Sequence, residues 1–206
     1  MIISPNKIIG SLVYRTREAL RNNQNFLDGL SIYDYNPNLF YEGEFSLWHY
    51  PGTQNEISNV FISLGENKDG SNLKYPSIFN INPIKQDKNG LNTTLHFNLC
   101  IVGPVLSEWL TQEREEQVFI PLLRPIYEEF INQIIKSGYF SLNFGAPAHK
   151  MYEVFTTGDS AGVLIERYGD HIDAIEIHGM ALGLKNICRN TYKRIEHENN
   201  LVTEKV

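Results

Sequence analysis

The sequence predicts an α+β fold in which an antiparallel sheet with a long hairpin packs against an N-terminal helix and a long central helix. Apolar and polar side chains alternate from Leu91 to Val102, which is typical of a half-buried strand. Apolar residues recur at helical spacing after Pro5 and again after Thr111. With 206 residues the chain can bury a sizeable core without a disulfide or a metal.

Charge and composition limit the possible functions. The net charge is −6, from 18 basic and 24 acidic residues. We therefore do not expect the chain as a whole to bind nucleic acid or an anionic membrane electrostatically. Of the two cysteines, Cys100 falls in the strand pattern and is predicted to be a buried thiol, which disfavours a secreted disulfide fold. We expect no signal peptide and no membrane span, because no apolar run approaches the roughly 20 residues that cross a bilayer.

The N-terminal helix is predicted to begin after Ser4, with Pro5 at its first position, and to end around Arg21. Arg15, Arg17 and Arg21 lie largely off its apolar stripe. A solvated face is the simpler interpretation, since exposed charges contribute little to stability. The functional interpretation is a contact with an acidic neighbour, so these arginines are candidate subunit-interface residues.

Short strands are predicted at Glu44–Tyr50 and Val60–Leu64. A hairpin with a long tip is predicted from the two strand-like runs Tyr75–Ile81 and Leu91–Val102. We expect one face of the second strand to pack in the core and the other to face solvent or a partner. Loop tips are frequent contact points, and the candidate interface residues in this one are Lys88 and Asn89.

The central helix is predicted to start at Thr111 and to run to about Gly138. Pro121 and Pro125 interrupt it. Because an interior proline removes a backbone hydrogen bond and costs about 3 kcal/mol, we expect a kink, or a break near Phe119.

Two residues at the corner before this helix are further interface candidates. An aromatic residue such as Trp109 at a strand-to-helix corner usually belongs to the core. However, Trp and Arg dominate the contacts of surfaces that do pair, so Trp109 and Arg114 join the candidate interface.

Beyond Phe140 the sequence predicts strands at Met151–Thr156 and Val163–Arg167, and a further strand from Ile172 to His178. Residues 1–189 are predicted to form one α+β domain. The polar segment 190–206 has no convincing apolar face, and we expect it to be mobile or ordered only by a neighbour.

The most enzyme-like cluster runs from Asp170 to His178. A strand there would place Glu176 and His178 on one face, where they could bind a divalent metal, but two ligands make a weak site. Ordinary polarity of an edge strand is the simpler interpretation. The sequence contains no phosphate-binding glycine loop, nucleophile elbow or zinc-type cysteine spacing, so we predict no catalytic residue, cofactor or metal.

Four of these stretches resemble a group of tailed-bacteriophage virion proteins. They are Tyr75-Pro-Ser-Ile-Phe, the strand Leu91–Val102, the helix with Trp109, Arg114 and Phe119-Ile-Pro-Leu-Leu-Arg-Pro-Ile-Tyr-Glu-Glu-Phe, and the late Asp170-His-Ile-Asp-Ala-Ile-Glu-Ile. The group is similar to connector-ring and tail-completion, tail-terminator-like proteins encoded beside the portal in crAss-like and related phages of gut bacteria. The resemblance spans about Ile8 to Leu184 and departs from the group's pattern between Ala146 and Asp170.

The resemblance implies an α+β subunit that forms a homo-oligomeric ring at the head-to-tail junction of the virion, where it joins portal to tail. Genomic DNA would pass through the lumen of the ring without sequence-specific binding, and no membrane, cofactor or catalytic residue is implied. Ring subunits need matching head-to-tail surfaces. Two alternatives stay open: a metal-dependent hydrolase or nuclease that uses Glu176 and His178, and a small adaptor that binds a host protein.

Overall fold

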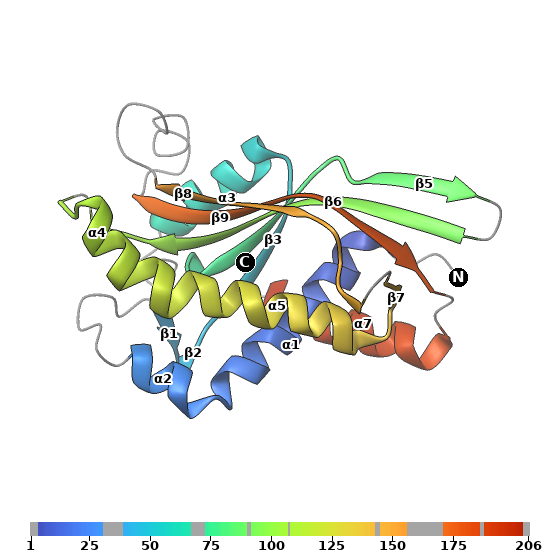
Figure 1. Cartoon of the computed structure of the whole chain (residues 1–206), viewed down its shortest axis with the longest axis horizontal. Coiled ribbons are helices and arrows are strands. Elements are labelled where there is room, and N and C mark those ends of the chain that lie inside the picture. The colour runs from blue at the N-terminus through green and yellow to red at the C-terminus, as the bar shows by residue number, and fades with distance from the viewer. Residues whose placement is uncertain are drawn as a thin grey trace.

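Two long antiparallel strands, β6 (Asn92–Pro104) and β9 (Ile172–Leu184), form the centre of the sheet (Figure 1). The computed structural model describes residues 4–30, 39–66, 73–89, 92–106, 108–142, 145–155, 171–185 and 188–203. Within them the strand order is β3-β4-β6-β9-β7, with β5 also paired to β6 and β8 to β9. The shorter strands of this sheet are β3 (Trp48–Gly52), β4 (Ser77–Ile81), β5 (Lys85–Asn89), β7 (Phe140–Ser141) and β8 (Lys150–Phe155). A separate small hairpin joins β1 (Phe40–Tyr41) to β2 (Glu44–Phe45).

The α+β class predicted from the sequence is confirmed. All pairings of the large sheet are antiparallel except the parallel pair of β3 and β4. The predicted hairpin is present, but its expected tip is largely strand. β4 pairs with the C-terminal half of β6, and β5 continues the pairing along the N-terminal half, from Lys85 opposite His96 to Asn89 opposite Asn92.

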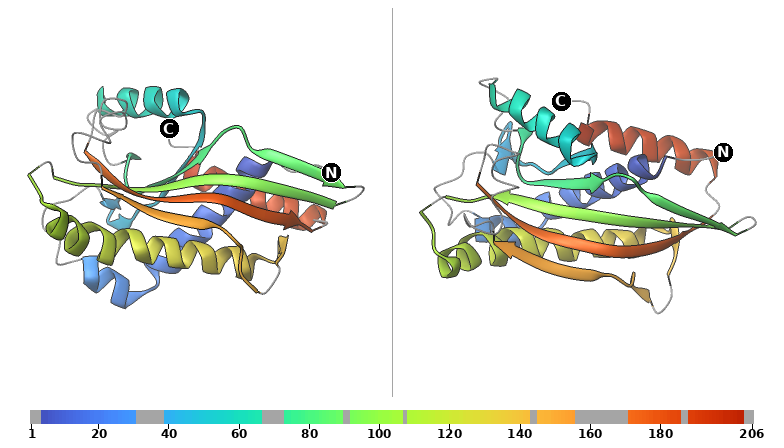
Figure 2. Two further views of the ribbon diagram at one scale, coloured as in Figure 1. Left: turned by 45° about the horizontal axis from the view of Figure 1, so that its top comes forward. Right: turned by 90° about the horizontal axis from the view of Figure 1, so that it is seen from above.

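Helices cover the two faces of the sheet unequally (Figure 2). α1 (Pro5–Arg21), α5 (Arg124–Ser137) and α7 (Arg189–Thr203) lie on one face, where the alternating side chains of β6 enter the main core. α2 (Gln24–Leu30) lies beside α1. On the opposite face α3 (Gln54–Glu66) packs near β3 and closes a smaller core.

α3 corrects the prediction of a strand at Val60–Leu64. A short apolar run does not by itself distinguish a strand from a buried helix. The residues that are buried, Ile57, Phe61 and Leu64, are spaced four and three apart, so they lie on one side of a helix.

The central helix continues through its prolines instead of breaking near Phe119. It starts as α4 (Thr111–Arg114), becomes the π-helical segment η3 (Glu115–Leu123) and continues as α5. In a π-helical turn the hydrogen bond reaches five residues back, and such segments occur where the regular ladder is interrupted, here around Pro121. Gly138 ends the helix in the left-handed conformation, with φ 72°.

The segment 190–206 is not a mobile tail as far as the structure describes it. α7 lies along α1, and its Ile195 and Val202 are fully buried. These two residues are seven apart, two helical turns, which is too sparse to give a visible apolar stripe. The predicted strand Val163–Arg167 lies outside the described residues.

Candidate functional site

The outer face of the sheet, the one that carries α3, is covered over only part of its length. Near β3 the outward side chains of β6 and β9, such as Cys100 and Ala174, are buried in the smaller core. Burial raises the pKa of the Cys100 thiol, which agrees with the neutral buried thiol expected from the sequence. Farther along the same strands the outward side chains are polar and at least partly exposed, as Asn98 and His178 are. We call this uncovered part the open sheet face.

A β-bulge shapes the centre of the open sheet face. Phe97 lies opposite Met180 and Leu99 opposite Ile177, so two residues of β9, His178 and Gly179, oppose the single residue Asn98. Gly179 has φ 67°, a conformation that L side chains rarely adopt, and its N–H donates to Oδ1 of Asn98 at 3.2 Å. Bulges of this kind redirect neighbouring side chains.

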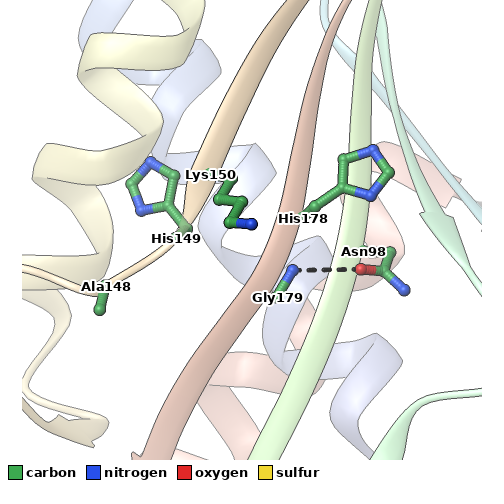
Figure 3. Close-up of a pocket in the computed structure, with 6 residues that line it drawn as sticks. All are labelled: Asn98, Ala148, His149, Lys150, His178 and Gly179. Atoms are coloured by element: carbon green, nitrogen blue, oxygen red, sulfur yellow. Dashed lines mark hydrogen bonds between the residues drawn. The ribbon is translucent and has the colours of Figure 1, made fainter.

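His178 lines two hollows on this face, the first of which is drawn in Figure 3. Its Nε2 lies 2.8 Å from a carboxylate oxygen of Glu176, and the ring of Tyr152 meets it edge-on with centroids 5.4 Å apart. One hollow, of about 540 Å³, is lined by Asn98, Ala148, His149, Lys150, His178 and Gly179. The second, of about 630 Å³, lies along β8 beside Tyr152 and Glu176.

A second histidine–carboxylate pair lies on the same face, nearer the β5–β6 turn. Nε2 of His96 lies 2.8 Å from Oδ2 of Asp87, which also accepts from Lys85 at 3.2 Å. Both pairs are partly exposed. The open sheet face therefore presents polar groups to solvent.

The side chains of Glu176 and His178 lie side by side, as predicted, because residues two apart on a strand share one face. The described residues contain no group of three or more His, Cys, Asp or Glu side chains placed to hold a metal ion. Asp170, the first residue of the enzyme-like cluster, lies outside the described residues. Asp173 is buried and faces the core, where its Oδ1 accepts from Arg114 at 3.2 Å.

The buried partner of Asp173 changes the interpretation of Arg114. This arginine was a candidate for the subunit interface, yet it is one of the largest fully buried side chains in the described chain. Its guanidinium faces the interior, because the acid that it pairs with lies on the inner face of β9. Trp109 is partly buried and packs against the main core. Lys88 and Asn89 are exposed on β5, as expected for residues near a turn.

The three N-terminal arginines contact other parts of the same chain and do not form a solvated face. Arg15 makes a two-pronged ion pair with Glu198 of α7, at 3.0 and 3.2 Å. Arg17 is buried and donates to the carbonyl of Leu201, and burial lowers its pKa. Arg21 donates to the carbonyl of Phe45, the last residue of β2, at 2.7 Å. For Arg15, the acidic neighbour that the sequence suggested is Glu198 of this chain's own α7.

The contact between α1 and α7 is a buried polar network that the sequence analysis missed. Ser11 donates to Glu198 and lies 3.3 Å from the hydroxyl of Tyr139. Beside it, Gly10 leaves room for His49 of β3 and Asn199 of α7. Desolvation lowers the pKa of His49 to about 3, and neither nitrogen of its buried ring has a hydrogen-bond partner among the described residues. The sequence did contain a signal of this close polar packing, because Gly10 and Ser11 lie inside the apolar stripe of the N-terminal helix.

Comparison of the chain with protein-family models, with curated proteins and with solved structures finds no match. No helix within the described ranges is both long and apolar enough to cross a membrane.

Proposed function

We propose that this chain is a structural subunit of a homo-oligomeric ring in the head-to-tail connector of a tailed bacteriophage, where the ring joins portal to tail around the DNA channel. The proposal rests on the resemblance of the hairpin, the central helix and β9 to virion proteins of that class. A ring subunit works by presenting surfaces to its neighbours, so the question for the structure is which surfaces this chain presents.

The observation that carries the proposal is a projecting arm, formed by β5 and the facing residues Asn92–His96 of β6. In Figures 1 and 2 the arm extends beyond the helices at one end of the molecule. Every residue of β5 is exposed, and among the described strands β5 pairs only with β6, which leaves its outer edge open. An open edge is a site where another chain can add, and charged residues such as Lys85 and Lys88 limit indiscriminate pairing.

The charge of the chain is compatible with a place around DNA. At a net charge of −6 the subunit has no overall attraction for phosphates, and a ring of such subunits would let DNA move through its lumen without holding it.

The proposal is tested on purified protein and on virions. Sedimentation and negative-stain electron microscopy of the protein should show rotationally symmetric rings, and electron microscopy of labelled virions should place the protein on the portal axis. A stable monomer that is absent from virions would refute the proposal.

A shortened arm provides a matched variant. Because Asp87 lies opposite Thr94, a two-residue Asn-Gly turn can replace residues 88–93 and close the hairpin two rungs earlier. We expect this variant to keep the circular dichroism spectrum of the natural chain and to lose the rings. Rings that form as well as before would show that the arm is not an assembly element.

A further inference from the structure

We infer that copies of this chain associate end to end, with the basic arm end of one copy against the acidic α4 end of the next. The inference rests on the proposed ring and specifies its subunit contact. Figure 1 shows the arm and the start of α4 at opposite ends of the long axis of the molecule.

The arm end carries an excess of basic side chains. The strands β5, β6, β9 and β7 lie side by side at this end. Their partnered residues follow one line across the sheet: Lys88, Thr93, Leu184 and Phe140. The end of α5 and the start of α7 lie at the same end of the molecule (Figure 1). The exposed lysines gathered there are Lys85, Lys88, Lys136, Lys185 and Lys193.

The acids near the arm end are held within the chain. Asp87 accepts from Lys85 and His96, and Glu196 forms an ion pair with Lys7 at 2.6 Å. Positive charge therefore dominates this end.

The opposite end has the reverse charge. It comprises α2, the segment after β6, α4 and the start of η3, and α2 contacts η3. Its acids are Asp28, Glu108, Glu113, Glu115 and Glu116. Its bases are bound to acids of the same chain: Arg21 to Glu44, Arg114 to Asp173, and Arg124 to Glu115 and Glu153.

Apolar side chains accompany the charges at both ends. Leu110 is 74% exposed just before α4, and Ile120 on η3 is 52% exposed. At the arm end Ile135 is 41% exposed, next to Lys136. An end-to-end contact can therefore bury apolar surface in addition to matching charge.

The charge pattern also selects the symmetry of the contact. A twofold dimer would join two arm ends or two α4 ends, and like charges would then repel. Joining opposite ends gives a heterologous contact, which closes into a ring when the rotation between neighbours allows it. Complementary charge mainly raises the association rate and fixes which surfaces meet, so the association should be sensitive to salt.

Charge reversal tests the inference in full-length protein by analytical ultracentrifugation. The arm-end variant carries Lys88→Glu and Lys185→Glu, and the α4-end variant carries Glu108→Lys and Glu116→Lys. We expect the natural chain to associate at low salt and to dissociate at about 1 M salt, where the screening length falls to about 3 Å. Each variant alone should associate at least tenfold more weakly, because two reversals among five charges leave the altered end nearly neutral.

Mixing the two variants should restore association in pairs, because the unaltered acidic end of one meets the unaltered basic end of the other. A chain with all four substitutions has two nearly neutral ends and should associate no better than either variant. Glu116→Lys is also measured alone, with Glu128→Lys as its matched control. Glu128 is exposed on the same continuous helix, away from either end, and its reversal makes an equal change in net charge, so association should stay at the natural level.

The outcomes separate this inference from the proposed function. Rings that form equally well in both charge-reversed variants would overturn the end-to-end contact and leave the ring proposal intact. A natural chain that remains a monomer at low salt would also overturn the contact, and its absence from virions would then overturn the ring as well. Circular dichroism of each variant excludes unfolding as the cause of lost association.

Discussion

Substitution of Gly10 by alanine provides the sharpest test of how α7 is held. Gly10 lies inside α1, and a Cβ atom built there would lie 1.9 Å from Oδ1 of Asn199 and 2.9 Å from Nδ1 of His49. Both distances are below 3.0 Å, which real Cβ atoms essentially never show, so the side chains of Asn199 and His49 must shift. In an exposed helix the same change would be favourable, since alanine exceeds glycine in helix propensity by about 1 kcal/mol.

The expected magnitude follows from two opposing effects. Overpacking a close contact costs about 1–3 kcal/mol. The gain in helix propensity offsets about 1 kcal/mol of this, so Gly10→Ala should lower the free energy of unfolding by about 1 kcal/mol.

Urea unfolding followed by tryptophan fluorescence measures this change, since Trp48 is buried in the core. Gly29→Ala is the matched control: Gly29 lies in α2, and nothing lies within 4 Å of its added Cβ. We expect this control to be neutral or stabilising. Asn199→Ala removes the obstacle, so it should recover at least half of the loss when combined with Gly10→Ala. A Gly10→Ala chain as stable as the natural one would refute the docking of α7 on α1.

Three further predictions concern single sites. His49 has a folded pKa of about 3 and an unfolded pKa near 6.5, so the unfolded chain binds more protons between these values. Unfolding free energy measured by urea should therefore fall by up to about 1.4 kcal/mol per pH unit as the pH drops below about 6.5, and His49→Gln should reduce that slope. Gly179→Ala should cost about 1 kcal/mol in urea unfolding because of the positive φ, and Gly179→Asn should cost less. Arg114→Ala should cost about 3–5 kcal/mol because it leaves the charge of Asp173 buried, and the double change to Met and Leu should recover most of that loss in thermal unfolding.

The parts of the fold that the sequence predicted are those with a dense local pattern. The alternation along β6 and the apolar stripe of α1 each involve many residues that repeat one period, so tertiary context had little to change. α7 lacks such a pattern. α3 has one, because Ile57, Val60, Phe61 and Leu64 recur at helical spacing, and only the short run Val60–Leu64 suggested a strand. α7 buries two apolar side chains and otherwise docks through ion pairs, which become visible only when Arg15 and Glu198 are placed face to face.

The candidate site was predictable to a similar degree. Strand periodicity alone placed Glu176 beside His178, and the structure has them in contact. The hollows around them depend on the bulge at Gly179 and on the register between β8 and β9, which no local pattern specifies. The fate of Arg114 likewise depended on Asp173, a distant residue brought close by the strand pairing.

The inferred end-to-end contact and the proposed DNA channel would be connected through the same charges. Pairing the arm end with the α4 end would place several of the chain's exposed lysines in contacts with acids of the next copy, and would not change the net charge of −6 for each subunit. Fewer lysines would then face the lumen, which would limit the attachment of DNA phosphates to the wall. The same pairing predicts a specific difference at low salt: when copies dissociate on dilution, the released arm ends become available to phosphate. A chain that binds DNA in its associated form more strongly than as a monomer would contradict this reasoning.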